Sequence, residues 1–326
     1  MQSVMGSNSD RHAGKETICE DVGIIWKHAE VTAGRPVEFR EVNRIDNASG
    51  VAYGRFVHSS MDCEGPLVVE YASGLSDPVR NAVLAHECCH ITRMYSVDSA
   101  QRPRMTKVLE LPQQAVPLLI EKLVDNIEEF PQDVIEKAAA EEKRYEKVSG
   151  REFRNGKADE TKRIVEWQPY LARLSDEKLR TVVKCWKYIE GWWLSLLDKV
   201  ELLLVNNPQD IQINRCLFRD YPELRDPVRE LLAVAFGTDV TDIPERGVFV
   251  PEKLYVCEYA MRFAFRKTMG DLIGQDFVAP FARHKEIKTL GVGLTDIVSR
   301  QSRQDCVGDH ETARRWAEEL GINGWF

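Results

Sequence analysis

The first third of the chain alternates between a helical pattern and several strand-like patterns of apolar residues. Within 16–33, apolar side chains recur three or four positions apart, as on one face of a helix. Two short segments rich in β-branched and aromatic residues follow, at Val37–Val42 and Val51–Val57, and turn-prone residues at 46–50 separate them. Another apolar run covers Leu67–Tyr71. The pattern predicts a helix, a β-hairpin and a further strand.

A second helix is predicted to begin near residue 77. Ser76 and Asp77 are both residue types that cap helix N-termini, and Pro78 suits the first helical turn. The apolar run Ala82–Ala85 follows, which is typical of a helix with a buried face. This helix therefore leads from an apolar segment directly into residues 86–90.

Beyond Pro103, strand-like segments nearly vanish and long patterns with helical spacing replace them. Polar residues at 149–160 indicate a loop or hinge. The predicted fold class is α+β, with a polar lead at 1–15, a small strand-containing unit at 16–148 and a mainly helical domain at 160–326. The helices predicted beyond Pro103 are Gln113–Phe130, Gln132–Ser149, Lys162–Leu174, Asp176–Leu204, Pro227–Phe236, Pro251–Ile273 and His310–Leu320.

Composition and charge narrow the class of protein. Hydrophobic residues make up 43% of the chain and charged residues 29%, which is typical of globular proteins. The 44 Lys and Arg against 52 Asp and Glu give a net charge of -8, and no long basic run occurs, so nucleic acid is not an expected partner. Charged residues interrupt the apolar segment at 186–205, so the sequence predicts no membrane span or membrane partner.

The cysteines and the N-terminus indicate a cytoplasmic location. Residues 1–15 lack the uninterrupted apolar stretch of a secretory signal. The 8 cysteines are scattered along a chain that is large enough to bury a core without disulfide bonds. Reduced thiols are therefore expected.

The candidate chemistry lies in the segment His86-Glu87-Cys88-Cys89-His90. His86 and His90 are four positions apart, so on a helix they share one face and can hold one zinc ion together. Glu87 is then beside the metal, where a general base takes a proton from water and returns it to a leaving amine. Cys88 and Cys89 are expected to be small buried packing residues.

These residues resemble the zincin metallopeptidases, in which a strand-rich lobe precedes a helix that bears HExxH. The resemblance covers about residues 35–130, and the order of a leading helix, a few strands and then Ala85–Ile91 is similar to the ImmA/IrrE-like branch. The metzincin pattern HExxHxxGxxH would need glycine at position 93 and histidine at position 96, but this chain has Arg93 and Ser96. The resemblance implies a zincin-like unit that cleaves peptide or protein substrates, with an endopeptidase favoured over an exopeptidase.

A catalytic zinc ion needs a third protein ligand, and the resemblance to the gluzincin branch implies a glutamate on a later helix. At about 100° per residue, Glu128 is nearest the apolar face of the predicted helix, and Glu121 and Glu129 are slightly further round. Glu128 is the first choice for the third ligand. Glu121 is the second, because the Glu-x-x-x-Asp pattern of that branch is met by Glu121 with Asp125, whereas Gln132 stands where Glu128 would need Asp.

The predicted function is zinc-dependent peptide-bond hydrolysis with Glu87 as general base. Leu67–Tyr71 is expected to lie next to the HExxH helix, where a strand edge can hold an extended peptide. The cleft is expected between the two units. Two alternatives stay open: an inactive zincin-fold protein that regulates or senses a protein partner, and a non-peptidase zinc hydrolase. Candidate donors to the reaction's oxyanion are Tyr95, Tyr145, Tyr221 and His284.

Overall fold

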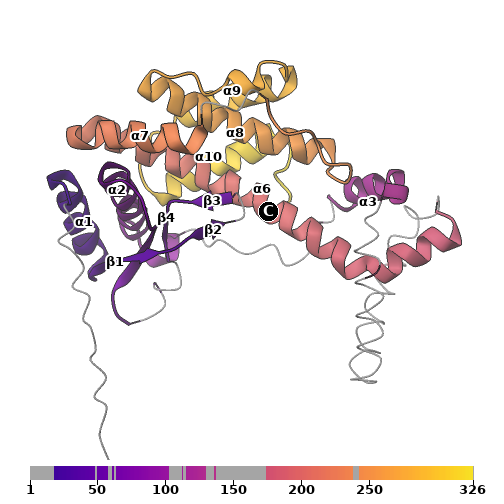
Figure 1. The fold of residues 1–326 in the computed structure, drawn as a ribbon, viewed down its shortest axis with the longest axis horizontal. Helices are drawn as coiled ribbons and strands as arrows, with labels where there is room; N and C mark the ends of the chain where they lie inside the picture. The colour runs from indigo at the N-terminus through magenta and orange to yellow at the C-terminus, as the bar shows by residue number, and fades with distance from the viewer. Residues whose placement is uncertain are drawn as a thin grey trace, which may run out of the picture.

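The chain combines a small mixed sheet near its N-terminus with a mainly helical region (Figure 1). This α+β arrangement confirms the predicted fold class. The helices predicted at 132–149 and 162–174 fall almost entirely outside the described residues. The computed structural model describes residues 18–47, 50–57, 61, 64–102, 112, 115–129, 136, 174–237 and 242–325.

The sheet is built around β5 (Leu67–Ala72), which pairs in parallel with β1 (Val37–Val42) and antiparallel with β4 (Gly54–Phe56). Five of the six β5 residues are buried. A near-continuous apolar run is typical of a strand with neighbours on both sides. The strand that was expected to provide a free edge is therefore the central strand, and β4 lies at the edge.

The predicted hairpin between 37–42 and 51–57 is wrong. β1 and β4 do not pair with each other, because β5 lies between them. The turn-prone residues do close a hairpin, but a shorter one, between β2 (Ile45–Asn47) and β3 (Gly50–Ala52).

The helix that carries the HExxH segment, α2 (Asp77–Tyr95), packs against α1 (Glu20–Ala33). Ser76 is its N-cap, and the Ser76 hydroxyl accepts a hydrogen bond from the Val79 N–H at 3.5 Å. α2 also contacts β4, α6 and α7. Such surroundings explain why apolar residues occur on several sides of α2, including the buried run Ala82–Ala85.

The longest helix continues far beyond the end that the sequence indicated. The predicted helix ended at Leu204, but the observed helix passes through Pro208 and ends at Asp220. The helix at 285–299 was not predicted. Within the described part of the chain, the helices after α2 are α3 (Val116–Asp125), α6 (Asp176–Asp220), α7 (Arg225–Phe236), α8 (Glu252–Ile273), α9 (Lys285–Ser299) and α10 (Cys306–Glu319).

Short 3-10 helices connect several of these elements. Within the described residues they are η2 (Ser99–Gln101), η3 (Ile127–Glu129), η4 (Pro222–Leu224) and η5 (Ala279–Phe281). No helix of the described part is long and apolar enough to cross a membrane.

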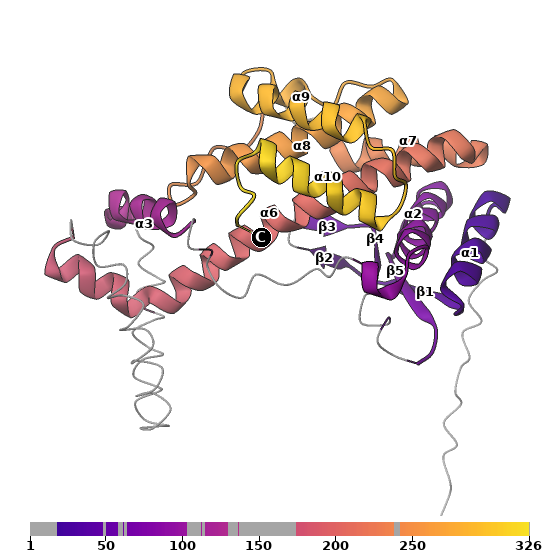
Figure 2. The same ribbon diagram turned by 180° about the vertical axis from the view of Figure 1, so that it is seen from behind.

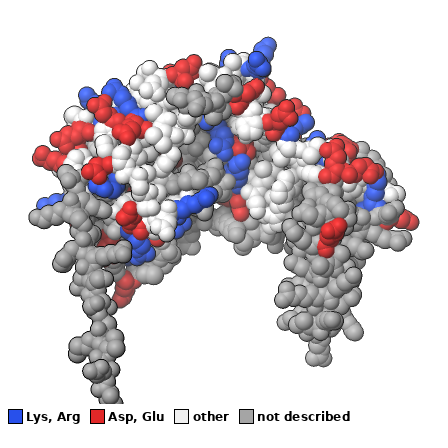
Figure 3. Space-filling model, in the orientation of Figure 1, with Lys and Arg blue, Asp and Glu red and all other residues white. Residues whose placement is uncertain are grey.

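α6 connects the two sides of the molecule (Figures 1 and 2). Its N-terminal half extends towards α3, and its C-terminal half lies against α2, α8 and α10. One core cluster contains buried residues from α1, α2, β5 and the helices from α6 onward. The division into units at 16–148 and 160–326 stays a prediction. On the face seen in Figure 3, acidic and basic side chains lie close together over much of the described surface.

The contact between α2 and β4 depends on a glycine. A Cβ atom at Gly54 would overlap Cγ1 of Val83 and would lie 3.2 Å from both Cγ and Oε1 of Glu87. Because glycine has no side chain, β4 approaches the helix at the residue that follows the first histidine.

We expect Gly54→Ala to lower the free energy of unfolding by about 1–3 kcal/mol, because the added methyl group overpacks this contact. Urea denaturation measures the change. Gly23→Ala is the matched control, since a Cβ there meets nothing within 4 Å, and alanine in a helix should raise stability by roughly 0.5–1 kcal/mol. Unchanged stability of Gly54→Ala would contradict the close approach.

Candidate metal centre

The two histidines of α2 bring their ring nitrogens together. Nε2 of His86 and Nε2 of His90 are 3.0 Å apart. Their side chains are 14% and 18% exposed, so both are largely shielded from water but remain accessible at one side. The arrangement follows from their spacing, since residues four apart on a helix lie one turn above each other.

A carboxylate from α6 completes a triangle with these nitrogens. Oδ1 of Asp210 lies 3.3 Å from Nε2 of His86 and 3.2 Å from Nε2 of His90. Zinc with four ligands at 2.0–2.1 Å places neighbouring ligand atoms about 3.3 Å apart, by tetrahedral geometry. The triangle therefore has the dimensions of one face of a tetrahedral zinc site. Asp210 was not among the residues predicted from the sequence to bind metal.

Asn214 follows Asp210 by one turn of α6 and contacts the other side of the His86 ring. Its Oδ1 lies 3.3 Å from Nδ1 of His86. When Nδ1 carries the proton, Nδ1 donates a hydrogen bond to this oxygen. The lone pair of Nε2 is then available to a metal ion bound at the triangle. A hydrogen-bond partner at the ring nitrogen that does not bind the metal orients a metal-binding histidine and fixes its tautomer.

Glu87 lies beside this triangle. Ligand atoms of His86, Glu87 and His90 all lie within 4.8 Å of one another, so this group can hold a metal ion. Glu87 is 8% exposed and packs next to Gly54 of β4. The structure thus brings together all three residues of the predicted motif, with the carboxylate next to the edge strand. The role of Glu87 as a general base stays a prediction.

The electrostatics of the centre favour a cation. Burial alone would lower the pKa of His86, but the hydrogen bond and charge of Asp210, with the charge of Glu87, raise it above 6.5. Burial would raise the pKa of Asp210, but hydrogen bonds with His86 and His90 hold it below its usual value. Two carboxylates therefore surround the histidine nitrogens with negative charge, which either protons or a metal ion can balance.

The two cysteines inside the motif behave as packing residues. Cys88 is fully buried, and Cys89 is largely enclosed. Burial raises the pKa of both thiols, and the charges of nearby acidic groups add to this effect. The thiols are therefore protonated at neutral pH, whereas a metal-binding cysteine needs a thiolate.

The structure does not bring the predicted third ligand to the histidines. Glu128 lies in η3, its side chain is 76% exposed, and it forms an ion pair with Lys178. Glu121 is exposed on α3. Both views of the fold place α3 at the opposite end of the molecule from α2. Among the described residues, the group of possible metal ligands is His86, Glu87 and His90, and it contains neither Glu128 nor Glu121. The carboxylate that contacts both histidines is that of Asp210.

Three of the four candidates for an oxyanion donor lie within the described residues. Tyr145 is not described. The ring of Tyr95 lies 4.3 Å from the Arg102 guanidinium, and Tyr221 follows the end of α6. Nε2 of His284 lies 2.9 Å from Oδ1 of Asp242. None of these contacts involves a residue of the triangle.

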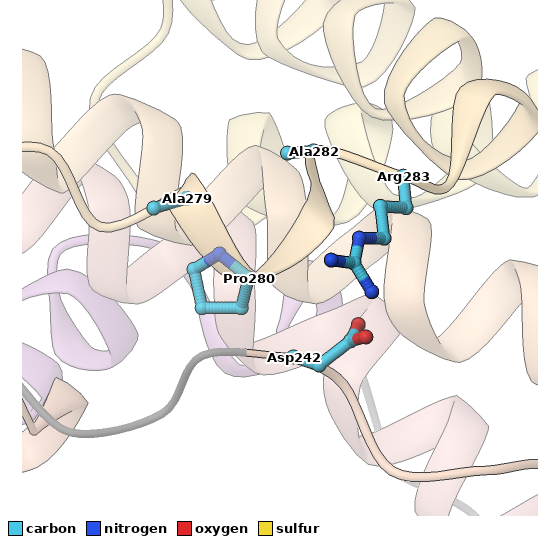
Figure 4. Close-up of a pocket in the computed structure, with 5 residues that line it drawn as sticks. All are labelled: Asp242, Ala279, Pro280, Ala282 and Arg283. Atoms are coloured by element: carbon cyan, nitrogen blue, oxygen red, sulfur yellow. The ribbon is translucent and has the colours of Figure 1, made fainter.

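Asp242 borders a surface cavity of about 290 Å³ that is separate from the candidate centre (Figure 4). Its carboxylate points towards the Arg283 guanidinium. The hydrogen bond from His284 is the main reason that the pKa of Asp242 lies below its usual value. The cavity shares no residue with the triangle.

No protein-family model matches the chain, and neither a curated protein nor a solved structure gives a significant match. The chemistry of the centre must therefore be inferred from its own geometry.

We expect Asp210→Asn to weaken zinc binding by about 100-fold, because an amide replaces an anionic ligand. A competition titration with a chelator, supported by elemental analysis, measures the affinity. Glu128→Gln makes the same chemical change at an exposed site and should keep the zinc affinity of the wild type. Loss of zinc by Glu128→Gln with retention by Asp210→Asn would contradict the assignment.

Asn214→Leu should weaken zinc binding by about tenfold, since the His86 ring loses its orienting partner but keeps the ligand atom. The same titration measures the change. Wild-type affinity in Asn214→Leu would show that the contact with Nδ1 has no part in metal binding.

Proposed function

We propose that this protein is a zinc-dependent peptidase, an endopeptidase, in which His86, His90 and Asp210 hold the metal and Glu87 is the general base. The observation that carries the proposal is the triangle of ligand atoms with sides of 3.0, 3.2 and 3.3 Å and a second carboxylate beside it. Three protein ligands leave the fourth tetrahedral position for water or substrate, as catalytic zinc sites require.

Zinc is the metal that these ligands and their neighbour fit best. Two imidazoles and one carboxylate are also the ligand set of non-haem iron(II) oxygenases. Glu87 favours hydrolysis over oxygen chemistry, because a carboxylate next to the metal ligands can accept a proton from water. Elemental analysis separates the two metals, and iron in place of zinc would overturn the proposal.

Each residue of the centre then has a defined task. Zinc bound here supplies Lewis acidity, which polarises a peptide carbonyl and lowers the pKa of water. Glu87 accepts the proton of the attacking water at its carboxylate and returns it to the nitrogen of the leaving amine. Asp210 supplies one negative charge that offsets part of the positive charge of the metal ion. Asn214 keeps His86 in the tautomer that leaves Nε2 available to the metal.

A peptide is the substrate class that the surroundings favour. β4 is one of the two edge strands of the sheet, and Gly54 on β4 lies next to Glu87. An extended peptide can add to a sheet edge through main-chain hydrogen bonds. Such a peptide would run past the carboxylate of the general base with its backbone aligned to β4. Small amides and esters would gain nothing from this edge, so the proposal favours a peptidase over another zinc hydrolase.

We expect the zinc-loaded wild-type protein to cleave members of a mixture of unstructured peptides, with the products identified by mass spectrometry. Glu87→Gln should bind zinc as the wild type does but cleave about 100- to 10,000-fold more slowly, because the amide cannot accept the proton. Glu121→Gln, on the exposed side of α3, is the matched control and should cleave normally.

The other outcomes of this experiment decide between the alternatives. Full activity of Glu87→Gln would remove the general base from the proposal. Stoichiometric zinc in a wild-type protein that cleaves no peptide, amide or ester would favour a regulatory or binding protein. Cleavage of small amides or esters without peptides would favour the non-peptidase hydrolase.

A further inference from the structure

A buried ion pair joins α2 to α10 one turn beyond the second histidine. Arg93 of α2 is 8% exposed and Asp309 of α10 is 4% exposed. The Arg93 guanidinium donates from Nε to Oδ2 of Asp309 at 2.9 Å and from Nη2 to Oδ1. It also donates to the main-chain oxygens of Gln304, at 3.0 Å, and Asp305, at 3.4 Å. The side chain of Arg93 therefore holds both α10 and the loop before it.

The same carboxylate is connected to α6 through two glutamine side chains. Nε2 of Gln301 donates to Oδ1 of Asp309 at 2.8 Å. Oε1 of Gln301 accepts from Nε2 of Gln212 at 3.3 Å and from the Thr312 hydroxyl at 2.9 Å. Gln212 is 4% exposed and also donates to the main-chain oxygen of Val298 at 3.1 Å. A continuous network thus runs from α2 to α6, in which Arg93, Asp309 and Gln212 are buried and Gln301 is partly exposed.

This network begins and ends next to the metal ligands. Arg93 follows His90 by three residues on α2. On α6, Gln212 is two residues after Asp210 and two before Asn214, so at about 100° per residue it faces the opposite side of the helix. The network therefore holds the rear of α6, while the front of α6 meets the histidines. Figure 2 shows α10 along α6, with one end beside α2.

The loop at the centre of the network has little room to move. A Cβ at Gly308 would overlap the main-chain oxygen of Arg303, so the loop packs directly on the start of α10. The Asp305 carboxylate caps α10 by accepting from the N–H groups of Val307, at 3.1 Å, and Gly308, at 2.9 Å. A guanidinium group that binds both oxygens of a carboxylate fixes the orientation of the two side chains as well as the distance between them. A buried ion pair is weak evidence for stability, because replacing both of its charges by apolar residues is often neutral or stabilising.

We propose that Arg93, Asp309, Gln301 and Gln212 are positioning residues that set the placement of α6 against α2, and hence the fit of the three ligands to zinc. This inference rests on the proposed metal centre and assigns a task to side chains that touch neither metal nor substrate. Apolar residues of similar size would fill the same space without fixing the direction of approach between the helices.

The test compares zinc affinity and the visible absorption of the Co²⁺-loaded protein, since that absorption depends on ligand number and arrangement. In Arg93→Met with Asp309→Leu, both buried charges are removed together. We expect this double variant to keep its circular dichroism, to bind zinc about tenfold more weakly and to show a changed Co²⁺ spectrum. Wild-type affinity and spectrum in the folded double variant would overturn the inference.

The matched control is an ion pair between Lys199 of α6 and Glu258 of α8, in which the carboxylate is buried and the lysine is 30% exposed. Glu258 is 5% exposed and pairs with Lys199 at 2.8 Å. Lys199 precedes Asp210 by eleven residues, or about 16 Å along the helix. Glu258→Gln should lower the melting temperature but leave the zinc affinity and the Co²⁺ spectrum unchanged, which separates positioning from general stability. Zinc affinity that falls in Glu258→Gln as much as in the double variant would overturn the inference.

Gln212→Met tests the positioning role if the double variant does not fold. It cuts the link to α6 and leaves the ion pair in place, so a weaker zinc affinity and an altered Co²⁺ spectrum are expected. An unchanged affinity and spectrum would overturn the inference. A wild-type protein that binds no zinc would instead overturn the proposed function itself, which the same titration reveals before any variant is made.

Discussion

The contact of Asp210 with two histidines is the interaction on which the rest of the site depends. It joins residues 124 positions apart in sequence and brings negative charge into a largely enclosed space between α2 and α6. Buried charge requires compensation, so the surroundings of this contact determine what the protein can bind. The positions of the histidine nitrogens and nearby carboxylates depend on three features of the fold. These are the packing of the helices, the approach of β4 at Gly54 and the hydrogen-bond network through Arg93.

The features of the site that were predicted from the sequence are those that depend on residues close together in the chain. The spacing of His86 and His90, the cap at Ser76 and the apolar run before the motif each follow from the periodicity of one helix. The choice of Glu128 used the same periodicity, which tells which side of a helix is buried but not which partner covers it. Asp210 was missed because Asn206-Asn207-Pro208 resembles a helix end, whereas tertiary packing carries α6 through the proline.

The errors in the fold have the same origin. β1 and β4 look like a hairpin because they are near in sequence, but each gains more by pairing with the apolar strand β5. α9 was missed because glycines weaken its helical pattern. Gly291 is required there by packing, since a Cβ would overlap the ring of Phe263 on α8. Local patterns therefore predicted the fold class and most helices but not the contacts between distant segments.

The division of the proposed ligands between α2 and α6 would also set an order of events during synthesis. Asp210 leaves the ribosome 120 residues after His90, which at ordinary rates of translation is a delay on the order of ten seconds. During that interval the nascent chain carries only the two histidines and Glu87, an incomplete set of ligands. In the proposed centre, full affinity for the metal would arise only once α6 has been made and has docked. Metal loading would then be a late event, and a truncated chain that ends before residue 210 would lack one of the three proposed ligands.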